Sequence, residues 1–449
     1  MEFELSKEFR DRFQQALDER DNTFIVETLE SVQSADISSL LYEFSSEESK
    51  YVLDILDKEV HAEIIRDLDS DTRKAFLKIY TPTEIAGVLN QLNSDDAADI
   101  LHEVPVKARE EVLALIDADL RLQVVDLLRY EETVAGGLMA KELIKVRQGW
   151  TVNQCIEEIR KQAENVDKFY AVYVVDEVDR LIGRVSLKSL VLANAFKSVA
   201  EIMEEEEVVS VETYLEDTEV ADIMQKYDLE SVPVVNVNGQ LVGRITIDDV
   251  VDVITEQAEE ERQIMAGISE DVEEDDSVWR NIRARLPWLI IGILGGLMNA
   301  KFMGLFEAEL MQVTAIAFFI PLIQATGGNV GIQSASIVVQ SLANPSFVVE
   351  GLWTRLAKVF LVAMLNGVFL AGIVFGANVL LFTEFELSLT VSIALFSVVL
   401  FASFMGTVTP MALNYFGFNP ALASGPFITT TNDLLGLTIY FFTVNLLLI

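Results

Sequence analysis

The sequence predicts a multidomain membrane protein with an all-α N-terminal domain of helical repeats, an α/β pair of repeated modules, a long connecting helix and a five-span α-helical transmembrane domain. Three observations predict this fold class. The C-terminal part is apolar and almost uncharged, the N-terminal part shows short amphipathic helices, and a strand–turn–strand–helix unit occurs twice between them. The expected parts are, in order, residues 1–135, 136–199 and 200–254 (the two modules), 255–285 (the connecting helix) and 286–449.

Charge is divided unevenly along the chain. The 449 residues contain 33 Lys and Arg and 71 Asp and Glu, but residues 286–449 hold three of these bases and six of these acids. Residues 1–285 therefore carry 30 bases and 65 acids, a net charge of −35. This negative charge disfavours nucleic acid as a partner, because residues 1–285 would repel a polyanion. Cys155 is the single cysteine, which excludes a disulfide framework.

The first 135 residues predict stacked α-helices. Apolar residues recur at the i, i+3, i+4, i+7 spacing of one helix face. The three clearest sets are Ile37, Leu40, Leu41 and Phe44; Ile85, Val88, Leu89 and Leu92; and Ala97, Ile100, Leu101 and Val104. Ser94 is expected as the N-cap of the last set, with Asp95 and Asp96 in the first helical turn. Short amphipathic helices at this density predict a helical repeat domain.

The internal repeat joins residues 173–190 to residues 233–250. Each copy has an apolar strand, a polar turn, a second strand with Gly-Arg, and a helix. This resembles a tandem pair of cystathionine-β-synthase (CBS) modules, which are regulatory sensors that often bind adenine nucleotides.

The nucleotide motif of such modules is half present. Gly243, Thr246 and Asp249 match the family spacing in the second module, whereas the first module has Ser186 but Ser189 in place of the acid. One interpretation is ATP as a regulatory ligand at Thr246, Asp249 and Ser186. The other is that Thr246 and Asp249 cap the following helix.

The connecting helix is strongly acidic and has few bases to pair with. Its acids include Asp248, Asp249, Asp252, Glu256, Glu259, Glu260 and Glu261. Like charges one turn apart destabilise a helix, and cations would relieve that repulsion. The alternative interpretation is a solvated connector.

Five apolar stretches follow, at roughly residues 286–305, 310–342, 355–382, 387–415 and 420–449. Each has at least about 20 residues, enough to cross a hydrocarbon layer of about 30 Å as a helix. The second and fifth are rich in Gly, Pro, Ser, Thr and Asn, so we expect them to be irregular and to face protein or a water-filled path.

Flanking charges predict the orientation. Arg280, Arg283 and Arg285 precede the first stretch, and Arg355 and Lys358 lie at the start of the third. The loops after these two stretches contain acids and no base: Glu307, Glu309, Glu384 and Glu386. The basic-inside preference places residues 1–285 in the cytoplasm of a cell (inner) membrane protein and, with five spans, Ile449 outside. The charged N-terminus does not have the form of a secretory signal.

The chain contains three distinctive motifs: Tyr130-EETVAGGLM, Pro321-LIQATGGNVGIQS and Pro420-ALASGPFITTTNDLLGL. Together they resemble the MgtE family of magnesium channels. The resemblance covers essentially the whole chain. It implies a homodimer with a pore at the subunit interface, lined by the second and fifth spans, that conducts Mg²⁺ down its electrochemical gradient. It also implies that Mg²⁺ bound at acidic cytoplasmic interfaces closes the pore, with the connecting helices as plugs.

Asp433 is the only acid inside the last four expected spans. An Asp at that depth costs about 2.5–3.5 kcal/mol on insertion scales, so it should face water, a partner or an ion. Two such carboxylates on a dimer axis would suit a hydrated divalent cation. Asn329 and Gln333 could add polar oxygens, and the resemblance aims the Thr429 carbonyl at the ion. The alternative is that Asp433 caps a broken helix.

For cation sensing, the resemblance carries over to acids of the connecting helix and the second module: Asp228, Asp249, Asp252, Glu260 and Glu261. On the helical domain, Asp95 and Asp99 lie one turn apart and are the expected partners facing the modules.

The predicted function is therefore a Mg²⁺-selective channel, closed by internal Mg²⁺, and not an enzyme. Two alternatives remain open. One is a nucleotide-gated transporter of another substrate, such as an anion, which the buried Asp433 disfavours. The other is a membrane-anchored Mg²⁺ or nucleotide sensor that conducts nothing, which the polar second stretch disfavours.

Overall fold

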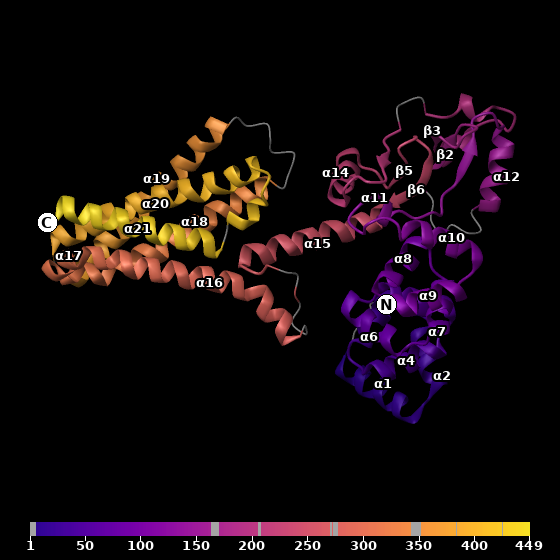
Figure 1. Cartoon of the computed structure of the whole chain (residues 1–449), viewed down its shortest axis with the longest axis horizontal. Coiled ribbons are helices and arrows are strands. Elements are labelled where there is room, and N and C mark those ends of the chain that lie inside the picture. Colours follow the sequence, from indigo (N-terminus) through magenta and orange to yellow (C-terminus); the bar gives the residue numbers. More distant parts are fainter. Residues whose placement is uncertain are drawn as a thin grey trace. The chain divides into compact units, whose positions relative to one another are not determined.

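The computed structural model describes residues 6–162, 170–204, 208–269, 272, 277–342, 352–382, 384–423 and 425–449. The chain forms two units, Met1–Ile254 and Thr255–Ile449 (Figure 1). The boundary between them falls inside one helix, α15 (Ile247–Ala266).

Unit 1 begins with short helices in succession. They are α1 (Lys7–Glu19), α2 (Asn22–Leu29), α3 (Ser34–Leu41), α4 (Ser46–Ile55), α5 (Lys58–Asp67), α6 (Ser70–Ile79), α7 (Pro82–Leu89), α8 (Ser94–Glu103), α9 (Val106–Leu115) and α10 (Ala118–Leu127). Side chains such as Ser45 and Thr81 accept backbone N–H groups at the helix starts, which explains why the helices begin where they do. Alternate helices pack together, as α3, α5, α7 and α9 do, and this confirms the predicted helical repeats.

The predicted apolar faces form the core of this domain. Ile37, Leu40, Leu89, Ile100 and Leu101 are at most 1% exposed. The same core cluster continues into the second module through residues that include Val211, Val220, Met224, Val232 and Val250. The helical domain and the second module therefore share one hydrophobic core.

The internal repeat appears as two similar three-stranded sheets. In the first, β1 (Lys145–Arg147) is parallel to β2 (Val172–Val175), which pairs antiparallel with β3 (Leu181–Val185). In the second, β4 (Val211–Glu212), β5 (Ser231–Val235) and β6 (Leu241–Thr246) repeat this order. The helices of this pair are α12 (Val152–Gln162), α13 (Leu187–Leu192), α14 (Asp217–Tyr227) and the start of α15. The turns of the two modules pair reciprocally, since Leu181 N donates to Gly239 O at 3.1 Å and Leu241 N to Asp179 O at 2.9 Å.

The segment between helical domain and modules docks on the second module. Short helix α11 (Ala135–Leu138) lies there, and the N–H groups of Ala135 and Gly136 each donate at 2.8 Å, to Leu215 O and Thr213 O. A Cβ at Gly136 would meet the Tyr130 ring and come within 2.9 Å of Thr213 O. The Gly-Gly of the motif at residues 130–139 is thus required by close packing.

Unit 2 contains long apolar helices, α16 (Val278–Met303), α18 (Ile320–Leu342), α19 (Leu352–Phe382), α20 (Phe385–Tyr415) and α21 (Pro426–Leu447), with short α17 (Glu307–Gln312) and 3-10 segments Gly304–Phe306, Thr314–Phe319 and Pro420–Ala423. Within the described part of the chain, four helical segments are long and apolar enough to cross a membrane: Val278–Gln312, Thr314–Leu342, Thr354–Leu381 and Phe385–Tyr415. The helix α21 has 22 residues but is not among these four.

The second apolar stretch is more regular than expected. The glycine-rich motif lies inside the continuous helix α18, so the expected irregularity there is wrong; it falls instead in the 3-10 segment before Ile320. Close helix packing explains the glycines. A Cβ at Gly331 would collide with the Asn432 side chain and lie 2.8 Å from Ile428 Cγ2 of α21. On its other side, Gly331 O lies against Gly406 of α20.

Replacing Gly331 with alanine should therefore loosen the contact between α18 and α21. We expect Gly331→Ala to lower the stability of the detergent-solubilised protein by about 1–3 kcal/mol, because overpacking costs about that much. Gly372 of α19 is the matched control, since a Cβ there would meet nothing within 4 Å. Thermal unfolding should separate the two variants, and an equal loss in both would contradict the packing argument.

Candidate metal sites

Asp433 lies inside helix α21, the eighth of its 22 residues. It is half-buried, and because the helix is continuous it does not cap a broken one. Helix α18 passes close by: a Cβ at Gly328 would lie 3.4 Å from Thr429 Cγ2 and 4.0 Å from Asp433 Oδ1. Thr429 is one turn before Asp433, and its hydroxyl donates to Gly425 O at 3.0 Å. Gly328 of α18 therefore lies next to Thr429 and Asp433 of α21.

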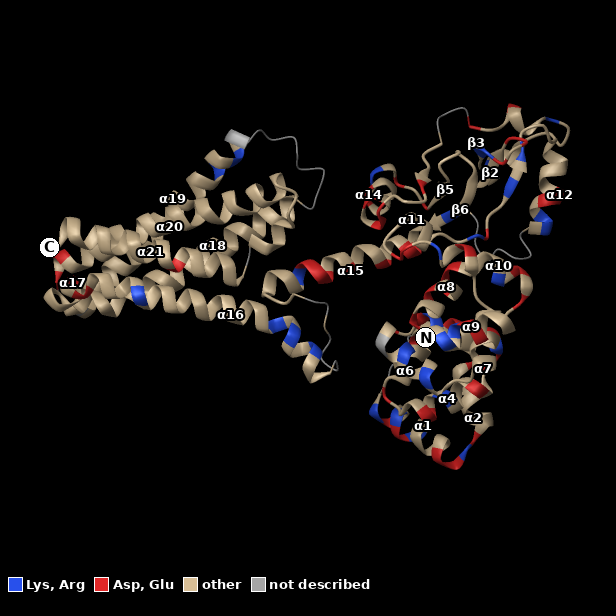
Figure 2. Cartoon of the chain, in the orientation of Figure 1, with Lys and Arg blue, Asp and Glu red and all other residues tan. Residues whose placement is uncertain are grey.

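Asn329 and Gln333 belong to a polar face of α18. Both are exposed in the single chain, and Ser336 and Gln340 continue the face at helical spacing, half-buried and exposed respectively. Figure 2 shows how little charge the surrounding helices carry. Amide side chains on a lipid-facing surface would be costly, so this face requires water or protein against it.

A second group of acids lies in unit 1, where α8 meets the start of α15. Loss of water on burial is the main cause that raises the pKa of Asp95 well above its ordinary value, followed by the charges of Asp96, Asp249 and Glu142. Burial likewise raises the pKa of Asp96 and of Asp249 to about 6 each. Arg66 Nη1 lies 3.9 Å from Asp96 Oδ2, and its positive charge offsets part of the rise in the pKa of Asp96. The structure therefore brings the predicted Asp95 and Asp249 together.

Asp99 and Asp252 flank this group. Asp99 keeps part of its surface exposed, yet surrounding protein displaces water from its carboxyl and raises its pKa to about 7, and the Asp96 charge adds to the shift. Asp252 is exposed; partial loss of water raises its pKa, and the charges of Asp248 and Asp67 contribute.

The other predicted sensing residues lie elsewhere. Asp228 is exposed at the C-cap of α14, with a left-handed φ of 52°. Glu260 is exposed and Glu261 half-buried on the part of α15 that belongs to unit 2. Burial raises the pKa of Glu261, and the neighbouring Glu260 charge adds to this.

The nucleotide-motif residues cap helices in both modules. Thr246 donates to Asp249 Oδ2 from its N–H at 3.0 Å and from its hydroxyl at 2.8 Å. In the first module, Ser186 Oγ accepts the Ser189 N–H at 3.1 Å and lies 2.8 Å from Ser189 Oγ. These bonds match the helix-capping interpretation, and Asp249 also faces the acids of α8.

Sequence reasoning missed one contact beside the acids. Asn93, not Ser94, is the N-cap of α8, and it makes no side-chain cap bond. Ser94 instead bonds to Glu142, from its N–H at 3.1 Å and its hydroxyl at 2.8 Å. A polar residue 48 positions away gives no periodic signal in the sequence.

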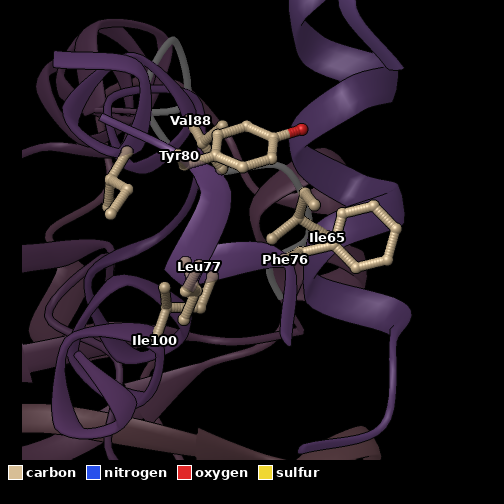
Figure 3. Close-up of a pocket in the computed structure, with 7 residues that line it drawn as sticks. Ile65, Phe76, Leu77, Tyr80, Val88 and Ile100 are labelled. Carbon is tan, nitrogen blue, oxygen red and sulfur yellow. The ribbon is translucent and has the colours of Figure 1, made fainter. Parts of the chain in front are cut away.

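A small cavity in the helical domain is unsuited to a cation. Its lining contains no charged side chain and consists of Ile65, Phe76, Leu77, Tyr80, Ile85, Val88 and Ile100 (Figure 3). Over the described residues, no three Asp, Glu, His or Cys side chains of one chain gather closely enough to hold a metal ion. The acidic group at α8 and α15 is therefore a set of repelling carboxylates and not a preformed cage.

Models of known families match four segments of the chain between residues 32 and 443. A divalent cation transporter domain matches residues 320–443, the MgtE intracellular N domain residues 32–133, and CBS domains residues 134–195 and 199–256. The chain is 35% identical to the magnesium transporter MgtE of Thermus thermophilus over 97% of both chains. It is 28% identical to that of Bacillus subtilis over 92% of this chain and 91% of the relative.

A solved structure is also similar. It is the cytosolic domain of the Mg²⁺ channel MgtE in complex with ATP, 38% identical, with a TM-score of 0.51 over 54% of this chain and 98% of that one.

The raised pKa values predict that acid favours the contact between α8 and the modules. The assembled cluster binds more protons than separated carboxylates do, so its stability rises as the pH falls through 7 and 6. Between pH 8 and pH 6 without divalent ions, we expect tryptic cleavage at Lys141 to slow at least about tenfold relative to an unfolded reference peptide. Asp95→Asn with Asp96→Asn should reduce this pH dependence, and Asp99 and Asp249 should account for what remains. An unchanged dependence in that variant would contradict the assignment.

Proposed function

The chain belongs to the MgtE family of magnesium transporters, and we propose that it is a Mg²⁺-selective channel that imports the ion down its electrochemical gradient and is closed by Mg²⁺ on the cytoplasmic side. The family is one of membrane transporters, not enzymes, and has a cytosolic N-terminal domain. A potential of 100 mV, inside negative, drives a divalent ion inward by about 4.6 kcal/mol, at roughly 2.3 kcal/mol per charge.

The observation that carries the proposal is a carboxylate held against a glycine of a neighbouring helix in an apolar unit. Asp433 is half-buried beside Gly328, where a Cβ would lie 4.0 Å from Asp433 Oδ1, so part of the Asp433 surface remains accessible to a hydrated ion. Mg²⁺ loses its water reluctantly, so a hydrated ion would hydrogen-bond to Asp433 and to oxygens such as the Thr429 carbonyl. Asn329 and Gln333 would line the same path.

A homodimer would cover the polar face of α18. Asn329, Gln333 and Gln340 are exposed on a helix that otherwise suits lipid, and a second copy would enclose them around a water-filled path. Helix α21 would then be the fifth span: its 22 residues are long enough, and its polar Thr, Asn and Asp residues would face the path instead of lipid. Five spans place Ile449 outside.

The connecting helix is suited to act as a plug. Within unit 2, the end of α15 rests against the start of α21: a Cβ at Gly425 would lie 2.6 Å from Met265 O, and one at Gly267 would lie 2.9 Å from Pro426 Cγ. Both glycines have positive φ, of 57° and 81°, which suits the tight contact. The contact is two turns before Asp433, so a movement of α15 would act directly on the proposed pore helix.

The acids of unit 1 and of α15 would sense the ion. Asp95, Asp99, Asp228, Asp249, Asp252, Glu260 and Glu261 are the proposed ligands, together with Asp96. Each ion that bridges two or more carboxylates would offset their repulsion and favour the closed arrangement. If the bound ions together favour the closed state by about 5.5 kcal/mol, the equilibrium between open and closed states shifts from 1:99 to 99:1. Several weak sites are therefore enough to close the channel.

ATP is proposed as a second, regulatory ligand of the module pair. The support is the similar cytosolic domain that was solved with ATP. Thr246, Asp249 and Ser186 would be the contacting residues, and Asp249 would then have to exchange its bonds with Thr246 for bonds to the ribose.

Neutralising the pore carboxylate tests the channel directly. We expect Asp433→Asn to abolish Mg²⁺ flux into liposomes while leaving folding and dimer formation unchanged, because the hydrated ion loses its charged partner. Glu386→Gln is the matched control, since it removes the charge of an exposed side chain in the first turn of α20. Normal flux through a dimeric Asp433→Asn protein would refute the pore assignment, and a folded wild-type dimer without flux would favour a sensor that does not conduct.

Neutralising the sensing acids tests the gate. Asp249→Asn, Asp252→Asn and Glu260→Gln combined should make closing insensitive to internal Mg²⁺, because the ligands that the ion would bridge and the repulsion that it would relieve are both removed. Flux against internal Mg²⁺ is the measurement. A closing curve equal to that of the wild type would exclude this gating mechanism.

A further inference from the structure

The first turn of α8 is attached to the segment that follows the helical domain by bonds that involve no cation. Ser94 is 0% exposed. It donates to Glu142 Oε1 from its N–H at 3.1 Å and to Glu142 Oε2 from its hydroxyl at 2.8 Å. Its hydroxyl oxygen also accepts the Lys141 N–H at 2.9 Å. Both carboxylate oxygens and both polar groups of the serine are thus engaged.

Lys141 extends this contact to two further elements. Its ammonium group donates to Asp126 Oδ2 of α10 at 2.8 Å and to Val242 O of β6 at 3.1 Å. Residues 141 and 142 therefore join α8 and α10 of the helical domain to a strand of the second module. We name Ser94, Lys141 and Glu142 the latch.

The latch binds the N-terminus of α8, where the N-cap side chain makes no hydrogen bond to the backbone. Ser94 is the first residue of α8, and the N-cap Asn93 leaves its side chain unused for capping. A carboxylate that accepts N–H groups at a helix N-terminus is favoured by the helix dipole as well as by the hydrogen bonds. Glu142 therefore replaces the missing cap from outside the helical domain.

The latch lies directly beside the repelling acids. Asp95 follows Ser94 in the chain, and the Glu142 charge is one of the causes that raise the pKa of Asp95. The hydrogen bonds hold the turn in place, while the charges of Asp95, Asp96 and Asp249 push it away. Only the second of these opposing effects responds to a divalent cation.

We propose that Ser94 and Glu142 are positioning residues of the Mg²⁺ sensor: they hold the first turn of α8 on the modules without a cation, and so set the Mg²⁺ concentration at which the channel closes. This inference rests on the proposed gating function. It assigns the latch no contact with the ion.

The test is Ser94→Ala in the full-length protein, reconstituted in liposomes with internal Mg²⁺ varied. Loss of the hydroxyl should raise the Mg²⁺ concentration for half closure by about two- to threefold, since a capping bond of this kind changes the closing equilibrium by up to about tenfold and several ions share that change. Maximal flux at low Mg²⁺ should not change. Ser70→Ala is the matched control, because Ser70 also begins a helix and bonds a glutamate, Glu103 at 2.7 Å, but inside the helical domain.

A double-mutant cycle makes the test specific. Because Glu142→Ala also removes a charge that repels Asp95, its own shift combines two opposing effects. Adding Ser94→Ala to it should add little, because the partner of the serine is already gone. Additive shifts, no shift in Ser94→Ala, or an equal shift in Ser70→Ala would overturn the proposal, and so would loss of flux at low Mg²⁺ in Ser94→Ala. A wild type that conducts at every Mg²⁺ level would instead refute the proposed gate itself.

Discussion

The carboxylates of α8 and of the first turn of α15 repel one another, and the behaviour of unit 1 depends on this repulsion. Protein surrounds Asp95, Asp96 and Asp249, so water screens their charges poorly and their pKa values rise. Arg66 compensates part of the charge from 3.9 Å. The shared hydrophobic core of helical domain and second module holds the acids together despite the repulsion. Any bound proton or cation therefore stabilises this arrangement without forming a new protein contact.

The same electrostatic constraint applies more strongly in unit 2. Lys358 is the last base in the chain, so neither of the two helices after it, α20 and α21, offers a base to neutralise Asp433. A half-buried carboxylate among apolar helices requires water or a cation near it. The glycines of α18 bring this helix close to Asp433 at Gly328 and against the side chains of α21 at Gly331. Close packing thus fixes the carboxylate while one side stays available to a hydrated ion.

The sequence predicted those features that depend on a periodic pattern. The apolar spacing located α3, α7 and α8, and the internal repeat located β2, β3, β5 and β6 in their correct order. The family resemblance, and not a periodic pattern, named Asp249 for cation sensing, and Asp95 was expected to face the modules; in the structure the charge of Asp249 acts on Asp95. The prediction was wrong for the Gly-rich motif of α18, because glycine is read as a helix breaker although close packing can require it within a helix. The Ser94–Glu142 contact was out of reach, since a bond between residues 48 positions apart depends on tertiary packing.

The latch also explains how weak ion sites could control a large domain. If the shared core alone opposed the repulsion, the first turn of α8 would separate from the modules more readily when the ion was absent, and each closure would have to reorder it. A contact that does not depend on the ion keeps the attached and detached states close in free energy. A small differential affinity per ion is then enough to change which state predominates. Ser94 and Glu142 supply such a contact with two hydrogen bonds at a helix end, next to the charges that oppose it. The threshold of the sensor would therefore be set by the balance of these two local interactions, and its steepness by the number of carboxylates that one closing movement brings together.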